Sequence, residues 1–318
     1  MNEQEILAIR TAAEKGDPYA QNQLGLFYAY DVKSQNLSIA FDWFTKSANQ
    51  GYADAQFQLG YCYDAGRGVL ASLKKALNWY TKAAEQGNVD AQFYLGIMYM
   101  NGEGGTKNIE KAVELFSKAA NQGHDSAQCN LGVMYQNGDG VSKNIIKSLD
   151  YFSKAAKQGN AIAQYNLGLI YQNGDDFPKN SNKAAEFFFN AANKGHPDSQ
   201  YNLGVMYHNG DGLPKNPKKA LEFFLKSAEQ GYSESQYNLG VMYQTGEDIP
   251  KNSAKAILWY TKAAEQDDTE AMYNLAYMYA HGDGIPKNPA KSLELYSRAA
   301  DRGHEEARMI VRALRAMK

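Results

Sequence analysis

Features that mark several common protein classes are scarce in this sequence. Only two of its 318 residues are cysteine, Cys62 and Cys129, which is too few for a disulfide framework and fits a reducing compartment. No apolar run is long enough to cross a bilayer, and residues 1–16 include acids but no apolar core of a signal peptide. We therefore expect a cytoplasmic protein without a membrane segment, or a periplasmic or secreted one if a signal was removed before Met1.

A strong charge of one sign is also lacking. The 33 lysines and arginines nearly balance the 35 aspartates and glutamates, which leaves a net charge of -2. Such a balance gives no general attraction to nucleic acid or to an anionic membrane surface. We expect neither of them as a partner.

What the sequence does contain is a repeat of about 36 residues. The pair Leu-Gly recurs from Leu24 to Leu239 at a spacing of 35 residues once and 36 afterwards, and an eighth copy at Leu275 has alanine in place of the glycine. A glycine also closes each copy, except that Asp267 replaces it once, and Asp is among the residues that tolerate a left-handed helix end. A fixed period of this length predicts a linear array of helical units.

Each copy is predicted to form two helices, as residues 198–231 illustrate. The first helix, 198–209, places apolar side chains four residues apart and ends at Gly210. Asn216 then caps the second helix, with Pro217 at the first helical position. The same pattern predicts first helices at 19–30, 54–65, 90–101, 126–137, 162–173, 198–209, 234–245 and 270–281.

The two ends of the chain depart from the repeat. We expect an N-terminal capping helix in residues 1–18, eight repeats in 19–305 and a C-terminal capping helix in 306–318. One period beyond the eighth copy, Arg312 and Arg315 stand where a close-packing glycine and a core tyrosine belong. Such a polar face is what the end of a repeat array requires.

The pattern A-x-x-x-L-G-x-x-Y, then N-G-x-G, then K-A-x-x-(W/Y/F)-(Y/F)-x-K-A-A-x-x-G resembles the Sel1-like repeat, a relative of the tetratricopeptide repeat. In one copy it is carried by Ala163, Leu167, Gly168, Tyr171, Gly174, Ala184, Phe187, Phe188, Ala191, Ala192 and Gly195. The resemblance implies an all-α, right-handed α/α superhelical solenoid with the first helices on its concave side. It also implies an adaptor or scaffold in multiprotein complexes, often bacterial. The cysteine pairs of one disulfide-stapled branch of the family are missing, so that branch's special properties are not carried over.

The related tetratricopeptide geometry implies which first-helix residues face a bound peptide. Asparagine stands just before the repeat leucine at Asn130, Asn166, Asn202, Asn238 and Asn274, and tyrosine stands two before it at Tyr165, Tyr201, Tyr237 and Tyr273. A carboxamide can satisfy both polar groups of a peptide unit, and tyrosine is common in binding hot spots. We expect these residues to form a peptide-binding groove. The alternative is that they belong to the ordinary repeat sequence and bridge neighbouring helices.

Lysine and arginine are missing from all eight predicted first helices. Acids stand five residues before the leucine at Asp54, Asp90, Asp198, Glu234 and Glu270. The groove is therefore expected to bind a neutral or basic segment. Lysines precede the cap asparagine instead, with an acid four residues earlier, in a row that we interpret as a solvated rim: Lys107, Lys143, Lys179, Lys215, Lys251 and Lys287, with Glu103, Asp139, Asp175, Asp211, Glu247 and Asp283.

Residue patterns for catalysis or metal binding are missing. The Gly-x-Gly loops follow no strand and lack a calcium-loop spacing, and the histidines show no metal-ligand spacing. Cys129, which takes a groove position, is the only candidate nucleophile. We expect no metal, no cofactor and no enzyme activity.

The sequence thus predicts a monomeric, non-enzymatic scaffold that binds a protein or peptide partner. A translocated effector or immunity protein that acts on one specific partner is the alternative. A hydrolase, of the kind suggested for relatives in the cysteine-rich branch, is less favoured.

Overall fold

The computed structural model describes residues 3–174, 176–247 and 249–316, and within these ranges it contains eighteen α-helices and no strand. The predicted α/α solenoid is confirmed. The first helices of the repeats are α2 (Pro18–Tyr30), α4 (Ala53–Ala65), α6 (Val89–Asn101), α8 (Asp125–Asn137), α10 (Ala161–Asn173), α12 (Pro197–Asn209), α14 (Ser233–Thr245) and α16 (Thr269–His281). The second helices are α3 (Leu37–Asn49), α5 (Leu73–Glu85), α7 (Ile109–Asn121), α9 (Ile145–Lys157), α11 (Ser181–Ala192), α13 (Pro217–Glu229), α15 (Ser253–Glu265) and α17 (Pro289–Asp301).

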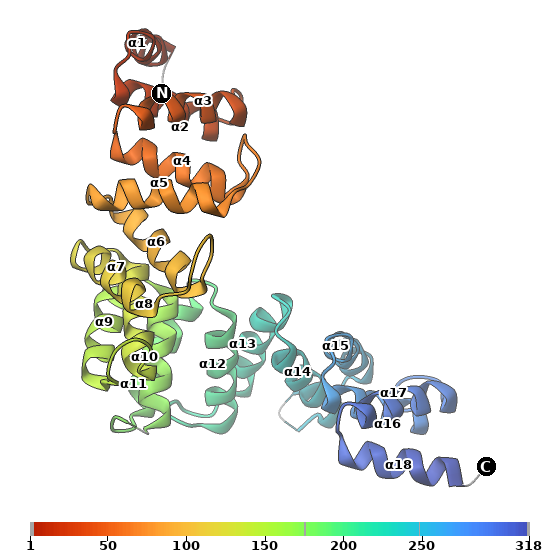
Figure 1. Ribbon diagram of the computed structural model, residues 1–318. Helices are drawn as coiled ribbons and strands as arrows, with labels where there is room; N and C mark the ends of the chain where they lie inside the picture. The colour runs from red at the N-terminus through yellow and green to blue at the C-terminus, as the bar shows by residue number, and fades with distance from the viewer. Residues whose placement is uncertain (1–2, 175, 248, 317–318) are drawn as a thin grey trace. The chain divides into compact units, whose positions relative to one another are not determined.

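Two further helices, α1 (Glu3–Glu14) and α18 (Glu305–Ala316), stand before and after the repeats. The chain divides into two compact units, Met1–Ala163 and Gln164–Lys318. Within each unit, consecutive helices pack on one another, from α1 to α9 and from α11 to α18 (Figure 1). The first helices of adjacent repeats also touch, as α14 and α16 do.

Local signals start and stop these helices as the sequence predicts. The Asn216 side chain accepts a hydrogen bond from the backbone N–H of Lys219 (3.1 Å) and so caps α13. Asparagines 36, 108, 144, 180, 252 and 288 cap their second helices in the same way. At the end of α15, Asp267 adopts φ 66°, the left-handed backbone that glycine has at the equivalent positions.

A close approach between the two helices of each repeat forms the core. The repeat leucine is buried, as Leu203 is, and in the first seven repeats the glycine after it faces an aromatic ring of the second helix. A Cβ at Gly204 would lie 2.6 Å from Cδ1 of Phe224, which is closer than real Cβ contacts allow. The same ring contact recurs at glycines 25, 60, 96, 132, 168 and 240.

Buried glutamines clamp neighbouring helices together, and the sequence analysis did not anticipate them. The Gln200 amide donates to the carbonyl oxygen of Ala192 (3.2 Å) and accepts a hydrogen bond from Gln230 Nε2 (2.7 Å), so it joins α11, α12 and the end of α13. The same pair of bonds is formed by glutamines 21, 56, 92, 128 and 236. A buried amide with both partners present contributes to stability and fixes the spacing of repeats.

A lysine in the first turn of the second helix covers a tyrosine of the first. Lys219 Nζ lies 5.0 Å from the ring centroid of Tyr207. Equivalent pairs recur in repeats two to eight at 4.4–5.3 Å. This cation–π contact joins the two helices of the hairpin in repeats two to eight.

We expect Gly204→Ala to lower the free energy of unfolding. Helix propensity alone favours alanine by about 1 kcal/mol, but the added Cβ collides with the buried Phe224 ring, and overpacking costs about 1–3 kcal/mol. Urea unfolding measures the sum. The double variant Gly204→Ala/Phe224→Leu should lose less than the two single changes added together; a stabilised Gly204→Ala protein would contradict the close approach.

Gln200→Met tests the amide clamp. It removes both hydrogen bonds and leaves the Ala192 carbonyl without its partner, so we expect a loss of roughly 1–3 kcal/mol in the free energy of unfolding. Asn209→Met, at the exposed end of the same helix, is the control and should change stability by less than about 0.5 kcal/mol. Equal effects of the two changes would show that the clamp does not stabilise the unit.

Candidate functional site

All nine predicted groove residues are half-buried on first helices. Asn130 lies on α8 of the first unit. The other eight lie in the second unit, and we call them the Tyr-Asn row: Tyr165, Asn166, Tyr201, Asn202, Tyr237, Asn238, Tyr273 and Asn274.

The tyrosine rings of this row pack against buried aromatic rings of their own repeats. The ring centroid of Tyr201 lies 6.0 Å from that of Phe224, the ring that also faces Gly204. Tyr165, Tyr237 and Tyr273 contact the equivalent rings at 6.0, 6.0 and 5.4 Å. Each ring therefore has one side against the core, which explains why the tyrosines are half-buried.

The asparagines of the row connect one repeat to the preceding one. The Asn202 side chain lies beside the hydroxyl of Tyr165, and Asn238 lies beside that of Tyr201, where Asn238 Nδ2 donates to the backbone oxygen of Glu234 (2.7 Å). Asn274 continues the pattern at Tyr237. These contacts agree with the interpretation that the two residue types bridge neighbouring helices. Peptide binding by the same residues stays a prediction.

The electrostatic environment of the row is acidic. Burial raises the pKa of Tyr201 and Tyr237, and the nearby carboxylates of Glu234 and Glu270 raise it further. The two glutamates are exposed. The tyrosine hydroxyls therefore stay protonated at neutral pH, beside surface carboxylates that would attract a cation.

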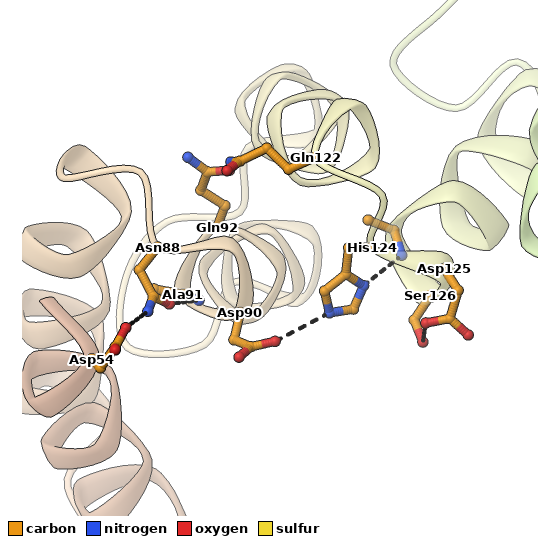
Figure 2. Close-up of polar contacts among 10 residues, drawn as sticks. Asp54, Asn88, Asp90, Ala91, Gln92, Gln122, His124, Asp125 and Ser126 are labelled. Atoms are coloured by element: carbon orange, nitrogen blue, oxygen red, sulfur yellow. Dashed lines mark hydrogen bonds and ion pairs between the residues drawn. The ribbon is translucent and has the colours of Figure 1, made fainter. Parts of the chain in front are cut away.

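The residues that precede the first helices form a second network, shown in Figure 2 for the first unit. Asn88 Nδ2 donates to Asp54 Oδ1 (2.8 Å), and His124 Nε2 lies 3.6 Å from Asp90 Oδ1. His124 Nδ1 accepts the backbone N–H of Ala127 (3.2 Å), so the hydrogen on the ring belongs at Nε2, facing the carboxylate. One side chain thus caps its own helix and binds the preceding repeat.

The histidines after the repeat-ending glycines are therefore caps. His124, His196 and His304 each accept a backbone N–H through Nδ1 and stack on an aromatic ring of the preceding repeat. Burial lowers the pKa of His196. Among the described residues no cluster of three or more His, Cys, Asp or Glu side chains could hold a metal ion. The recurrence of Asp, Asn or His directly after the closing glycine was the sequence signal for this capping role.

The position predicted for Cys129 in the groove is not what the structure shows. Cys129 is 4% exposed, because its short side chain sinks toward the core where a longer tyrosine reaches outward. Burial raises the pKa of Cys129 to about 12 and that of Cys62 to about 11. The reactive thiolate is therefore scarce at neutral pH at both positions.

Two lysines of the row pair across repeats. Lys179 Nζ lies 3.8 Å from Asp211, and Lys251 Nζ lies 3.4 Å from Asp283, so each lysine meets the acid of the next repeat. Asp175, which belongs to the same pattern, lies outside the described residues. Such exposed pairs contribute little to stability.

None of the helices in the described ranges is both long and apolar enough to cross a membrane.

The family model for the Sel1 repeat matches at residues 18–52, 53–88, 89–124, 125–160, 161–196, 197–232, 233–268 and 269–304. No match was found among curated proteins. A protective antigen present in uropathogenic Escherichia coli strains, which displays an SLR fold, is 35% identical, with 97% of this chain and 67% of that chain covered and a TM-score of 0.87.

A Sel1 repeat protein from Oxalobacter formigenes is 31% identical, with 97% of this chain and 89% of that chain covered and a TM-score of 0.73. An immunity protein from Pseudomonas aeruginosa is 23% identical, with 68% of this chain and 82% of that chain covered, and its TM-score of 0.42 is too low to support an argument. Eight consecutive matches between residues 18 and 304 show that this chain belongs to the Sel1 repeat family, as the resemblance implied.

Proposed function

We propose that this chain is a non-enzymatic scaffold that binds a neutral or basic segment of a partner protein along the Tyr-Asn row. Sel1-repeat proteins are generally protein-interaction scaffolds. Two features are proposed for this chain in particular: the surface that binds the partner, and the neutral or basic character of the bound segment. The free, buried thiols and the raised pKa values of both cysteines favour a role without nucleophilic catalysis.

The observation that carries the proposal is the composition of the first helices in the second unit. They present half-buried tyrosines and asparagines in register, with the exposed acids Glu234 and Glu270 beside them. Their sequences contain no lysine or arginine. An acidic or nucleic-acid partner would lack the cations that it needs, whereas a lysine or arginine in a bound segment would meet carboxylates.

The contacts within the row also prepare it for binding. Since Asn238 donates a hydrogen bond to the backbone oxygen of Glu234 and Tyr201 packs on Phe224, these side chains are already ordered before a partner arrives. Ordering side chains is a large part of what association costs. An amide that donates through its nitrogen still has an oxygen that accepts hydrogen bonds from a peptide N–H.

Selection of peptides from a phage-displayed random library tests the proposal. We expect enriched peptides to be neutral or basic, and Tyr201→Ala to weaken a synthetic copy of an enriched peptide by about 2 kcal/mol or more, roughly thirtyfold. Glu234→Gln should weaken the basic peptides moderately, mainly at low salt. Fluorescence anisotropy measures each affinity.

Lys215→Ala, on the lysine row, is the matched control and should change the affinity far less. Because Tyr201 also packs on Phe224, melting temperatures of all variants are compared to separate lost binding from lost folding. Enrichment of acidic peptides would overturn the proposal. An affinity that falls in Lys215→Ala and is unchanged in Tyr201→Ala would also overturn it.

A further inference from the structure

A cavity of the second unit lies where α16, α17 and α18 meet, and we call it the end pocket. Its volume is about 600 Å³, within the roughly 300–1,000 Å³ typical of pockets that bind small organic groups. Its walls are mainly aromatic and aliphatic: Tyr273, Tyr277, Leu293, Tyr296, Ile310 and Leu314. Tyr273 is also a member of the Tyr-Asn row, so the pocket is continuous with that surface.

The same junction is nearly closed at two other places in the molecule. The cavity between α2, α3 and α4 measures about 10 Å³, and the one between α12, α13 and α14 about 90 Å³. Each is lined by the residue just before the repeat leucine and the residue three after it. The three cavities can therefore be compared position by position.

Two substitutions distinguish the end pocket. The position three after the leucine is filled by Cys62, 4% exposed, and by Met242, 5% exposed, whereas Leu314 is 39% exposed. The position before the leucine carries an amide at Gln58 and Asn238, but Ile310 at the end pocket. The two inner junctions are therefore filled and have an amide side chain at their edge, whereas the junction at α18 is an open apolar cavity.

Two acidic residues lie on α16 and α18, N-terminal to the residues of these helices that line the end pocket. Glu306 lies one turn before Ile310 on α18, and Glu270 lies one turn before Tyr273 on α16. His304 lies between them, with Nε2 3.4 Å from Glu270 and Nδ1 3.3 Å from Glu306; because Nδ1 accepts the backbone N–H of Ala307, only Nε2 presents a hydrogen to a carboxylate. Both glutamates are exposed.

Arg308 of α18 contacts the end of α17. The guanidinium of Arg308 donates to the Ala300 carbonyl oxygen (3.5 Å) at the end of α17. Arg312 and Arg315 are not at the one-turn spacing that joins Glu306, Ile310 and Leu314 on one face. The charged residues one turn before the pocket-lining residues Tyr273 and Ile310 are therefore acidic.

We propose that the end pocket anchors one large apolar side chain, of the leucine or phenylalanine class, from a basic peptide segment whose flanking lysine or arginine pairs with Glu270 and Glu306. This inference rests on the proposed function, because the anchored segment is the one that runs along the Tyr-Asn row. Burial of the apolar side chain supplies affinity, and the two carboxylates select against acidic segments.

Three synthetic, capped, fluorescein-labelled peptides test the proposal by fluorescence anisotropy. Each has a glycine-serine background, with a central Leu-Phe pair flanked by lysines, the same pair flanked by glutamates, or an Ala-Ala pair flanked by lysines. We expect the Lys-flanked Leu-Phe peptide to bind, and the other two to bind at least about tenfold more weakly.

Leu314→Trp fills the end pocket and should weaken the Lys-flanked Leu-Phe peptide by at least about tenfold. Met309→Trp, which adds the same side chain at a 61% exposed position of α18, is the matched control and should leave the affinity unchanged. Leu314→Met introduces the residue that Met242 provides at the equivalent inner position. It is the second variant, used if the tryptophan impairs folding. Melting temperatures monitor folding.

Unchanged binding in both Leu314 variants, or no binding by the wild-type protein at millimolar peptide, overturns the pocket proposal. If Tyr201→Ala still weakens library-selected peptides in that case, the proposed function stands without the end pocket. If Leu314→Trp abolishes binding while Tyr201→Ala has no effect, the pocket stands and the row does not bind. Self-association that Leu314→Trp prevents, measured by sedimentation, would identify a second copy as the occupant and overturn the proposal.

Discussion

The close approach of each first helix to an aromatic ring of its second helix is the contact on which the rest of each unit depends. Gly204 leaves no Cβ, so the Phe224 ring can lie where a larger residue would collide. Repeat units interact only with their neighbours, so no central core can compensate for a hairpin that is too wide. The hydrogen bond from Gln230 to Gln200 joins the same hairpin, because these residues lie at the end of α13 and on α12.

The contacts that connect repeats and the surface proposed for binding use the same side chains. Tyr201 packs on Phe224 and lies beside Asn238, while part of the residue remains accessible. This dual use has a thermodynamic consequence. A row that is ordered by its own contacts loses little side-chain entropy when it binds, but each of its residues also contributes to stability, so binding and folding must be measured together.

Sequence reasoning predicted the features that depend on local backbone chemistry. Asn216 caps α13, and Asp267 takes the left-handed helix end. Features that depend on which helices lie side by side were missed. Gln200 looks like a surface residue in the sequence and is buried because it spans neighbouring helices. Cys129 was placed in the groove by position alone, although its side chain is too short to reach it, and Lys251 pairs with the next repeat rather than with its own.

The eighth repeat and the helix after it depart from the repeat pattern at the clamp glutamine and at the end pocket. Only the first departure is compensated by other contacts. Met272 replaces the clamp glutamine, and Arg298 donates to the Ala264 carbonyl oxygen (3.3 Å), while Arg302 pairs with Asp267 (2.7 Å). The lost amide contacts are thereby replaced. At the end pocket no such replacement fills the space beside Leu314, although a longer side chain there would bury more apolar surface and add packing contacts. Stability alone therefore favours a filled junction, and the open one is better explained by a side chain that enters from a partner.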